Sequence, residues 1–450
     1  MINMVYKSEF LGIEPVKTLL IKLSIPAIIG MLIMALYNVV DGFFIGRWVG
    51  TLAFTGVSLI FPFQMVVLAF GITFGIGGAS ILSRKLGEGN LKIAKKAAGN
   101  SISMVLILSL LITTLGILFA VPILNLLGAS VEVFPYAKDY YLIILYGTIF
   151  NSYLIVANNL VRAEGLAKIA MFGMVFPAVL NTMLDVLFII GLNMGVKGAA
   201  IATVISQVVG VIYLTYYQLG KHTSIKYKVN DFLIDIKTCV EIILIGASEF
   251  ARTIMSSVLL VLGNNLLGFY GGDIAIAIFG VVNRIAMLLF MPVHGIVQGL
   301  QPIVGYNYGK GNLKRVSEAV KLALISTTSL CFLGFIFIIA FPEQFIRIFI
   351  TDSEVISKGI LPIRIFFGFS FLIGAQMVIS GLYQSLGKAL PAFVLSCARQ
   401  TLFLIPPMII LPMYIGLNGI WLAIPLGDFL GFLLSVGLIY IDRKMLNLSF

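Results

Sequence analysis

Two aspartates lie in long apolar stretches of the sequence with no basic residue at a similar depth. Asp41 directly follows the apolar segment 16–40, and Asp185 interrupts the apolar run 176–192. A carboxylate at the centre of a membrane helix costs about 2.5–3.5 kcal/mol on insertion scales, so it is rarely kept without a use. Because no arginine or lysine can neutralise them, a species from solution must do so. We expect Asp41 and Asp185 to form one buried site for a proton or a cation.

Two neutral side chains could complete such a site. Asn181 precedes Asp185 by four residues and therefore lies on the same face of a helix, and Thr203 lies in the next apolar segment. Carboxylate, amide and hydroxyl oxygens are the ligands of hard cations, so these residues with Asp41 could bind Na⁺. A proton needs only the two carboxylates. The residue types do not choose between these ions, and a hydrogen-bonded network that only packs helices is the alternative.

Three further polar residues are candidates for contact with a ligand. Tyr37 lies one turn before Asp41 on the same helical face, where its hydroxyl could reach the carboxylate or simply pack. Gln298 and Gln301 flank an apolar turn just before Pro302. They could line a cleft, and packing between helices is an equally good interpretation.

The second half of the chain differs because its buried acids have basic neighbours. Glu249 lies three residues before Arg252, and Asp428 can be paired with Arg399. Arg284 is a third arginine that the apolar pattern places at depth. We expect structural ion pairs here rather than a second cation site.

Composition makes this chain an all-α integral membrane protein. Of its 450 residues, 60% are hydrophobic and only 11% are charged, whereas soluble domains have about 25% charged residues. Twelve apolar segments are long enough to cross a bilayer as helices. They cover roughly 16–40, 52–82, 97–121, 137–161, 167–192, 196–219, 238–264, 274–304, 316–341, 359–384, 391–414 and 418–441.

The net charge of +11 reflects membrane orientation rather than nucleic-acid binding. The amino terminus and every second loop hold 21 of the 30 Lys and Arg residues, with Arg162 and Lys168 counted in one of these loops, and the intervening loops hold 6. Positive residues accumulate on the cytoplasmic side. We therefore expect a multi-pass protein of the cell membrane with both termini in the cytoplasm.

The sequence contains an internal duplication. Residues 87–92 (GEGNLK) match 309–314 (GKGNLK) at an offset of 222, and Gly165 matches Gly387 at the same offset. Each copy holds six apolar segments, so the copies enter the membrane from the same side. We expect two pseudo-symmetric six-helix lobes around a central cleft, at 1–219 and 238–450, joined by a cytoplasmic linker at 220–237.

Several of these stretches together resemble the multidrug and toxic compound extrusion (MATE) transporters, and more closely their prokaryotic branches. They are YNVVDGFFIGRWVG at 37–50, RAEGLAK at 162–168, LNTMLDVLFI at 180–189 and QGLQPIVGYNYGKGN at 298–312. The resemblance covers nearly the whole chain.

This resemblance implies an antiporter rather than an enzyme, with no cofactor. A drug-like, often cationic compound would leave the cell by alternating access while Na⁺ or H⁺ enters. The coupling motif of several family members falls on Asp41, Asn181, Asp185 and Thr203, and a substrate-contacting position falls on Asn158. Bending of the first helix at a proline fits Pro26, which removes a backbone hydrogen bond. We expect a monomer whose partners are the bilayer, a coupling cation and a small organic substrate.

One alternative function belongs to the same wider superfamily. A flippase for a lipid-linked precursor would need a cationic cleft that binds pyrophosphate, and Arg252, Arg284 and Arg399 leave that function open. The absence of a nucleotide-binding loop or a catalytic motif argues against a pump or an enzyme.

Overall fold

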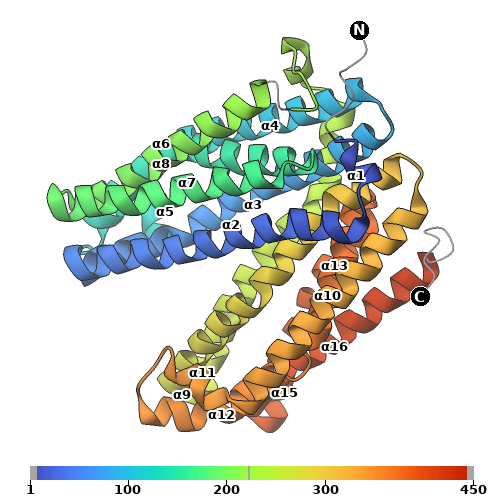
Figure 1. Ribbon diagram of the computed structural model, residues 1–450. Coiled ribbons are helices and arrows are strands. Elements are labelled where there is room, and N and C mark those ends of the chain that lie inside the picture. The colour runs from blue at the N-terminus through green and yellow to red at the C-terminus, as the bar shows by residue number, and fades with distance from the viewer. Residues whose placement is uncertain (1–7, 221–222, 443–450) are drawn as a thin grey trace.

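A computed structural model describes residues 8–220 and 223–442, except for the side chain of Asn38. The described residues form helices joined by turns and loops, with no β-strand. The helices form two bundles that meet near α1, α10 and α13 and diverge from there (Figure 1).

The first bundle contains eight α-helices and two π-helical segments. These are α1 (Phe10–Ile13), α2 (Val16–Phe44), η1 (Ile45–Val49), α3 (Thr51–Gly87), α4 (Leu91–Leu118), α5 (Ala120–Leu126), α6 (Phe134–Ala163), α7 (Ala167–Asp185), η2 (Val186–Gly191) and α8 (Gly195–Leu219). A 3₁₀ turn, η3 (Val229–Phe232), follows in the connecting segment. The second bundle contains α9 (Ile236–Gly309), α10 (Leu313–Ala340), α11 (Pro342–Arg347), α12 (Ser353–Phe366), η4 (Ser370–Leu372), α13 (Ile373–Ser385), α14 (Ala389–Thr401), α15 (Ile405–Ile415) and α16 (Leu417–Asp442).

Twelve membrane spans emerge from these elements. Among the described residues, ten continuous helical segments are long and apolar enough to cross a bilayer, and the bent pair of 353–366 with 370–385 makes an eleventh. The twelfth span lies within α9. Backbone hydrogen bonds continue along all 74 residues of α9, but its backbone is not helical throughout. Gly272 interrupts it with a φ of +64° and divides it into two spans. The twelve-helix prediction is therefore confirmed.

The duplicated stretches share their backbone geometry. Asn90 caps α4 by accepting a hydrogen bond from Ile93 N, and Asn312 caps α10 by accepting one from Arg315 N. The glycine before each cap has a positive φ, +75° at Gly89 and +77° at Gly311, which is a conformation that glycine adopts without strain. The repeat read from the sequence is thus a repeat of structure.

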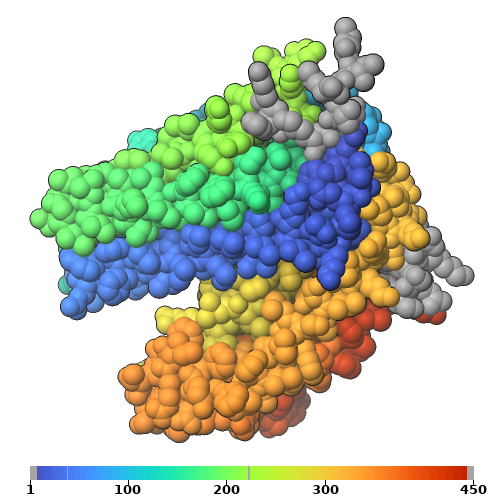
Figure 2. All heavy atoms as spheres, viewed as in Figure 1, coloured from blue at the N-terminus to red at the C-terminus, as the bar shows by residue number. Residues whose placement is uncertain are grey.

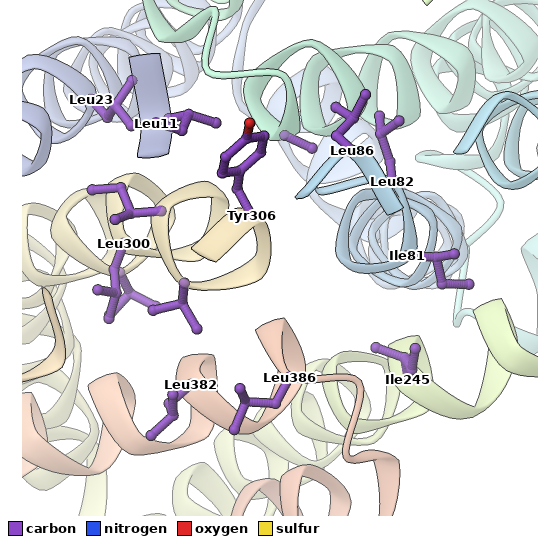
Figure 3. Close-up of a cluster of buried hydrophobic side chains, with 14 of the residues drawn as sticks. Leu11, Leu23, Ile81, Leu82, Leu86, Ile245, Leu300, Tyr306, Leu382 and Leu386 are labelled. Carbon is purple, nitrogen blue, oxygen red and sulfur yellow. The ribbon is translucent and has the colours of Figure 1, made fainter. Parts of the chain in front are cut away.

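The two bundles share one hydrophobic core, and further cores lie within single bundles. The shared core joins side chains of α1, α2, α3, α9 and α13 at the end that carries the connecting segment, including Leu23, Leu82, Leu300 and Leu382 (Figure 3). At the opposite end, one core lies wholly within the first bundle and another wholly within the second. The bundles are therefore held together at one end only.

Close backbone packing seals that shared end. Gly246 of α9 lies directly against the Thr73 carbonyl of α3, and Gly77 of α3 lies against the Ile242 carbonyl of α9, so neither glycine has space for a Cβ atom. Away from this seam the bundles separate, and the space-filling view shows a hollow between α2 and the second bundle (Figure 2). The molecule is closed at the end with the basic loops and open at the other.

Candidate functional site

The two lone aspartates come together inside the first bundle. Asp41 lies on α2, and Asp185 is the last residue of α7. Their carboxylates are close enough to interact electrostatically. Asp185 is fully buried, with 0% of its surface exposed, and Asp41 is half-buried. The Oδ1 atom of each is closed off from solvent and has no hydrogen-bond partner among the described residues.

Asn181 and Thr203 both lie beside Asp185. Asn181 is one turn before it on α7, and Thr203 is on the neighbouring helix α8. The Asn181 amide lies between the two: with its nitrogen toward Asp185 it donates to Oδ2 at 2.9 Å, and its oxygen accepts from Thr203 Oγ1 at 3.2 Å. With the amide reversed, the nitrogen donates to Thr203 Oγ1 at 3.2 Å and the amide oxygen faces Asp185. All three side chains are buried.

Two tyrosines complete the surroundings of the acids. Tyr37 of α2 interacts with both carboxylates and lies within hydrogen-bonding reach of Thr203. Tyr140 of α6 also interacts with both carboxylates and reaches Gln64 of α3. The sequence pointed to Tyr37, but it gave no signal for Tyr140 or Gln64, because neither lies on the helices that carry Asp41 and Asp185.

Each acid is followed by a π-helical segment, which sequence reasoning missed. The π-helix η1 begins four residues after Asp41, η2 begins directly after Asp185, and the two segments contact each other. In a π-helix each backbone hydrogen bond joins residues five apart instead of four. Such segments occur often at functional sites. Both helices that carry an acid are therefore locally irregular at the site.

No base neutralises this pair. Within residues 8–220 and 223–442, no lysine, arginine or histidine forms an ion pair with Asp41 or Asp185. The described residues also hold no cluster of three His, Cys, Asp or Glu side chains of the kind that binds transition metals. Two carboxylates, an amide and a hydroxyl instead suit a proton or a hard monovalent cation.

The other polar candidates of the first bundle and the seam lie elsewhere. Gln298 and Gln301 line a small cavity in the closed seam between the bundles, not the open cleft. Asn158 is 5% exposed and already engaged, because it donates to the Ala170 carbonyl at 2.7 Å and accepts from Arg162. Both ends of the Asn158 amide therefore contact protein groups in this structure, and its contact with a substrate stays a prediction.

The second bundle neutralises its own acids. Arg252 Nε donates to Glu249 at 2.9 Å, and Gln384 donates to the same carboxylate at 2.8 Å. Arg399 Nε donates to Asp428 at 2.9 Å.

Two arginines differ from their predicted positions. Arg284 is exposed rather than buried, and its guanidinium lies over the Phe349 ring with 5.9 Å to the ring centre. The negative face of the ring attracts the guanidinium, so Arg284 is partly stabilised without an acid partner. The charge pattern places Arg162 in a loop, but Arg162 lies in the last turn of α6 and is 6% exposed.

Comparison with known proteins places this architecture in one family. A family model described as MatE matches residues 26–187 and again 250–410, once in each bundle. The chain belongs to the MatE family. Curated members with similar sequences include the multidrug export protein MepA of Staphylococcus haemolyticus, 26% identical over 95% of this chain and 94% of the relative. These relatives are named as export proteins and transporters, not as enzymes.

Solved structures of MATE proteins have the same fold. The MATE multidrug transporter DinF-BH is 43% identical and matches with a TM-score of 0.90 over 97% of this chain and 98% of that one. A MATE family transporter in an outward-facing conformation is 26% identical, with a TM-score of 0.90 over 98% of each chain.

Proposed function

We propose that this MatE-family protein exports drug-like, often cationic organic compounds in exchange for Na⁺ or H⁺. The observation that carries the proposal is the Asp41–Asp185 pair, buried in the first bundle without a base. The names of the relatives support multidrug export, and the unpaired acids provide a binding site for the coupling ion. Binding of that ion removes the charge that makes the site costly to bury.

Alternating access fits the shape of the molecule. Basic loops collect at the closed end, and the positive-inside rule assigns that end and both termini to the cytoplasm. The open end then faces outward, the state in which a substrate is released and a coupling ion enters. Ion binding at Asp41 and Asp185 drives transport only if the inward-open and outward-open states bind the ion with different affinity.

The Asn181 amide offers a way to sense the bound ion. An ionised Asp185 is best matched by the amide nitrogen, which donates to it. A protonated Asp185, or one that shares a cation, is matched by the amide oxygen at the same 2.9 Å separation. Reversal of the amide on ion binding would change the hydrogen bond to Thr203 and so carry the signal from α7 to α8.

Pro26 is the proposed bending point of α2. In this structure α2 runs without a break through Pro26, which is buried. Its flanking residue Ser24 lies against Gly299 of α9, and Ile28 lies against Gly295. Because Pro26 removes one hydrogen bond of the helix, bending there would move Asp41 relative to the second bundle.

The structure gives less support to a flippase than the sequence did. Two of the three arginines that would form a cationic cleft, Arg252 and Arg399, are neutralised by Glu249 and Asp428. Of the three, only Arg284 has no acid partner within the described residues, and one exposed guanidinium is a weak pyrophosphate site.

Transport in proteoliposomes tests the proposal. Export of a fluorescent lipophilic cation such as ethidium is measured with a Na⁺ gradient or a pH gradient imposed separately, and we expect one of the two to drive it. Asp41→Asn and Asp185→Asn should each reduce driven transport by at least about tenfold, the loss expected when an essential charge is removed. The matched control is Asp139→Asn. The Asp139 side chain is 45% exposed and forms an ion pair with Lys197. Undiminished ion-driven transport in both site variants would disprove the coupling role.

A further inference from the structure

A small polar cavity lies in the closed seam, apart from the paired aspartates. It is about 20 Å³ in volume, enough for a water molecule or one small ion. Its polar lining comes from both bundles and includes Ser80, Asn159, Arg162, Gln298, Gln301 and Gln384. The cavity exists only while the bundles are closed at this end.

Arg162 is a buried cation without an acidic partner. Its guanidinium donates to Asn158, and it makes no other hydrogen bond or ion pair with the described residues. The ranges 1–7, 221–222 and 443–450 contain no Asp or Glu. No acidic side chain anywhere in the chain therefore pairs with Arg162, although burying an unpaired charge is costly.

Two carboxylates near the cavity in sequence or contact, Glu164 and Glu249, have other partners. Glu164, two residues along the chain, accepts hydrogen bonds from Thr223 at 2.9 and 3.0 Å. Glu249 is held by Arg252 and reaches the cavity wall only through Gln384. The carboxyl end of α6 offers partial negative charge, which compensates a guanidinium only in part.

Two side chains that line the cavity, one from each bundle, have hydrogen-bond donors without an acceptor among the described residues. Arg162 has five N–H groups and one protein acceptor. Gln298 makes no hydrogen bond with the described residues, and its Oε1 is closed off from solvent. The other lining amides have fixed acceptors: Gln301 donates to Gln384 at 3.0 Å, Gln384 donates to Glu249 at 2.8 Å, and Asn159 donates to the Ile155 carbonyl at 2.9 Å.

We propose that this cavity binds a small inorganic monovalent anion, chloride in the cell, between Arg162 and the Gln298 amide. The anion supplies the negative charge that Arg162 lacks, and the Gln298 nitrogen supplies a second donor once the amide turns toward the cavity. Since the two donors belong to different bundles, the bound anion holds the seam closed.

This site has a consequence for the conformational cycle. Chloride binds the seam-closed state better than the seam-open state, so it shifts the population toward the closed seam. Chloride binding at this cavity is independent of which compound is exported and of which cation drives export.

Binding of radiolabelled chloride to the purified full-length protein tests the site directly. With gluconate as the replacement anion, we expect saturable binding at a single site in the wild-type protein. Arg162→Gln should abolish it, and Gln298→Leu should weaken it roughly tenfold, because one donor is lost while the charge remains. Arg284→Gln, which removes an exposed arginine outside the cavity, should bind like the wild type.

Thermal unfolding is a second measurement, which shows whether a variant that binds no chloride is still folded. Chloride should raise the thermal unfolding midpoint of the wild type and of Arg284→Gln relative to gluconate, and it should raise that of Gln298→Leu by less. Saturable binding that persists in Arg162→Gln would overturn the proposal. The same conclusion follows if the wild type binds no chloride saturably, or if Gln298→Leu binds and responds like the wild type.

Discussion

The Asn181 amide lies 2.9 Å from Asp185 Oδ2 and within 3.2 Å of the Thr203 hydroxyl, so one side chain links the buried acid of α7 to α8. An amide can present either a donor or an acceptor to the same position. Asn181 is therefore the side chain best suited to report the state of Asp185.

The first prediction concerns this link. Asn181→Leu keeps the approximate size of the side chain but leaves Asp185 and Thr203 without their shared partner. We expect a loss of stability of about 1–3 kcal/mol for the unsatisfied groups and a reduction of ion-driven export by at least about tenfold. Proteoliposome transport and thermal unfolding of the same preparations measure the two effects.

A conservative replacement separates coupling from packing. Asn181→Gln retains both amide functions on a longer chain, so it should recover part of the transport. If Asn181→Leu exports at the wild-type rate while losing stability, the amide is a packing group and the proposed link between α7 and α8 is wrong.

The second prediction concerns the glycine seam between α3 and α9. A Cβ at Gly246 would collide with the Thr73 carbonyl, whereas a Cβ at Gly280, in the second span of α9, meets no atom within 4 Å. Gly246→Val should therefore prevent closure of the seam, and Gly280→Val should not. Spin labels at Lys92 and Lys314, which are both exposed and flank the seam on opposite bundles, should move apart only in Gly246→Val.

The comparison of the two valine variants also controls for helix propensity. Both replace a glycine of α9 with the same β-branched residue, so their helix propensities change alike. Equal label distances in the two variants would mean that the seam tolerates a side chain and that glycine is not needed for closure.

The seam illustrates what the sequence could not provide. The twelve spans, the duplication and the lone acids follow from hydropathy, motif spacing and charge, all of which are local in the chain. Which face of α9 meets α3 is not local, because the contact joins two helices that are far apart in the chain. Gly246 therefore looked like any glycine of a membrane helix until the fold placed it against Thr73.

Charged residues near helix ends show the same limit. Arg162 and Arg284 each lie within a few turns of the end of a span. Whether a side chain there is buried depends on how far the helix continues and on what packs beside it. The helix α6 extends through Arg162 and buries it, whereas α9 leaves Arg284 exposed over Phe349. The π-helices after Asp41 and Asp185 also left no sequence signal.

The third prediction uses the unequal burial of the Arg399–Asp428 ion pair. The Asp428 side chain is 1% exposed and that of Arg399 is 28% exposed. Arg399→Met strands a fully buried carboxylate, for which breaking a buried pair costs about 3–5 kcal/mol. Asp428→Asn leaves an arginine that can turn toward solvent, so its cost should be smaller. Thermal unfolding midpoints at one heating rate should rank wild type, Asp428→Asn and Arg399→Met in decreasing order.

The double variant completes this comparison. When Asp428→Asn is combined with Arg399→Met, no charge remains to be stranded, so the double variant should be more stable than Arg399→Met alone. A double variant that is less stable than both single variants would show that packing of the long arginine side chain, rather than charge, holds α14 to α16.

The fourth prediction is a pH dependence at the segment that joins the two bundles. Glu164, directly after α6, is 1% exposed and accepts hydrogen bonds from Thr223 at 2.9 Å and from Ser224 N at 2.5 Å. Burial raises the pKa of the Glu164 carboxyl from 4.5 to about 7, even though these donors oppose the rise. The folded segment therefore holds a proton that the free segment releases.

The sign of the effect follows from this difference. A carboxyl with a higher pKa in the folded chain favours the folded state below its unfolded pKa, and this stability is lost as the pH rises through the folded value. Attachment of residues 223–225 should therefore be firm at pH 6 and weaker at pH 8. Hydrogen exchange of these amides, corrected for the intrinsic pH dependence of exchange, should show less protection at pH 8.

Two controls isolate Glu164 as the cause. Glu164→Gln cannot ionise, so protection of residues 223–225 should become independent of pH between 6 and 8. The Asp235 amide in the same connecting segment donates to Asn100 at 2.7 Å, and hydrogen bonds from Thr238 hold the pKa of the Asp235 carboxyl at about 2. Its protection should not change over this range, because Asp235 stays ionised throughout. Equal pH dependence at Asp235 and at residues 223–225, or a pH dependence that survives in Glu164→Gln, would assign the effect to another group.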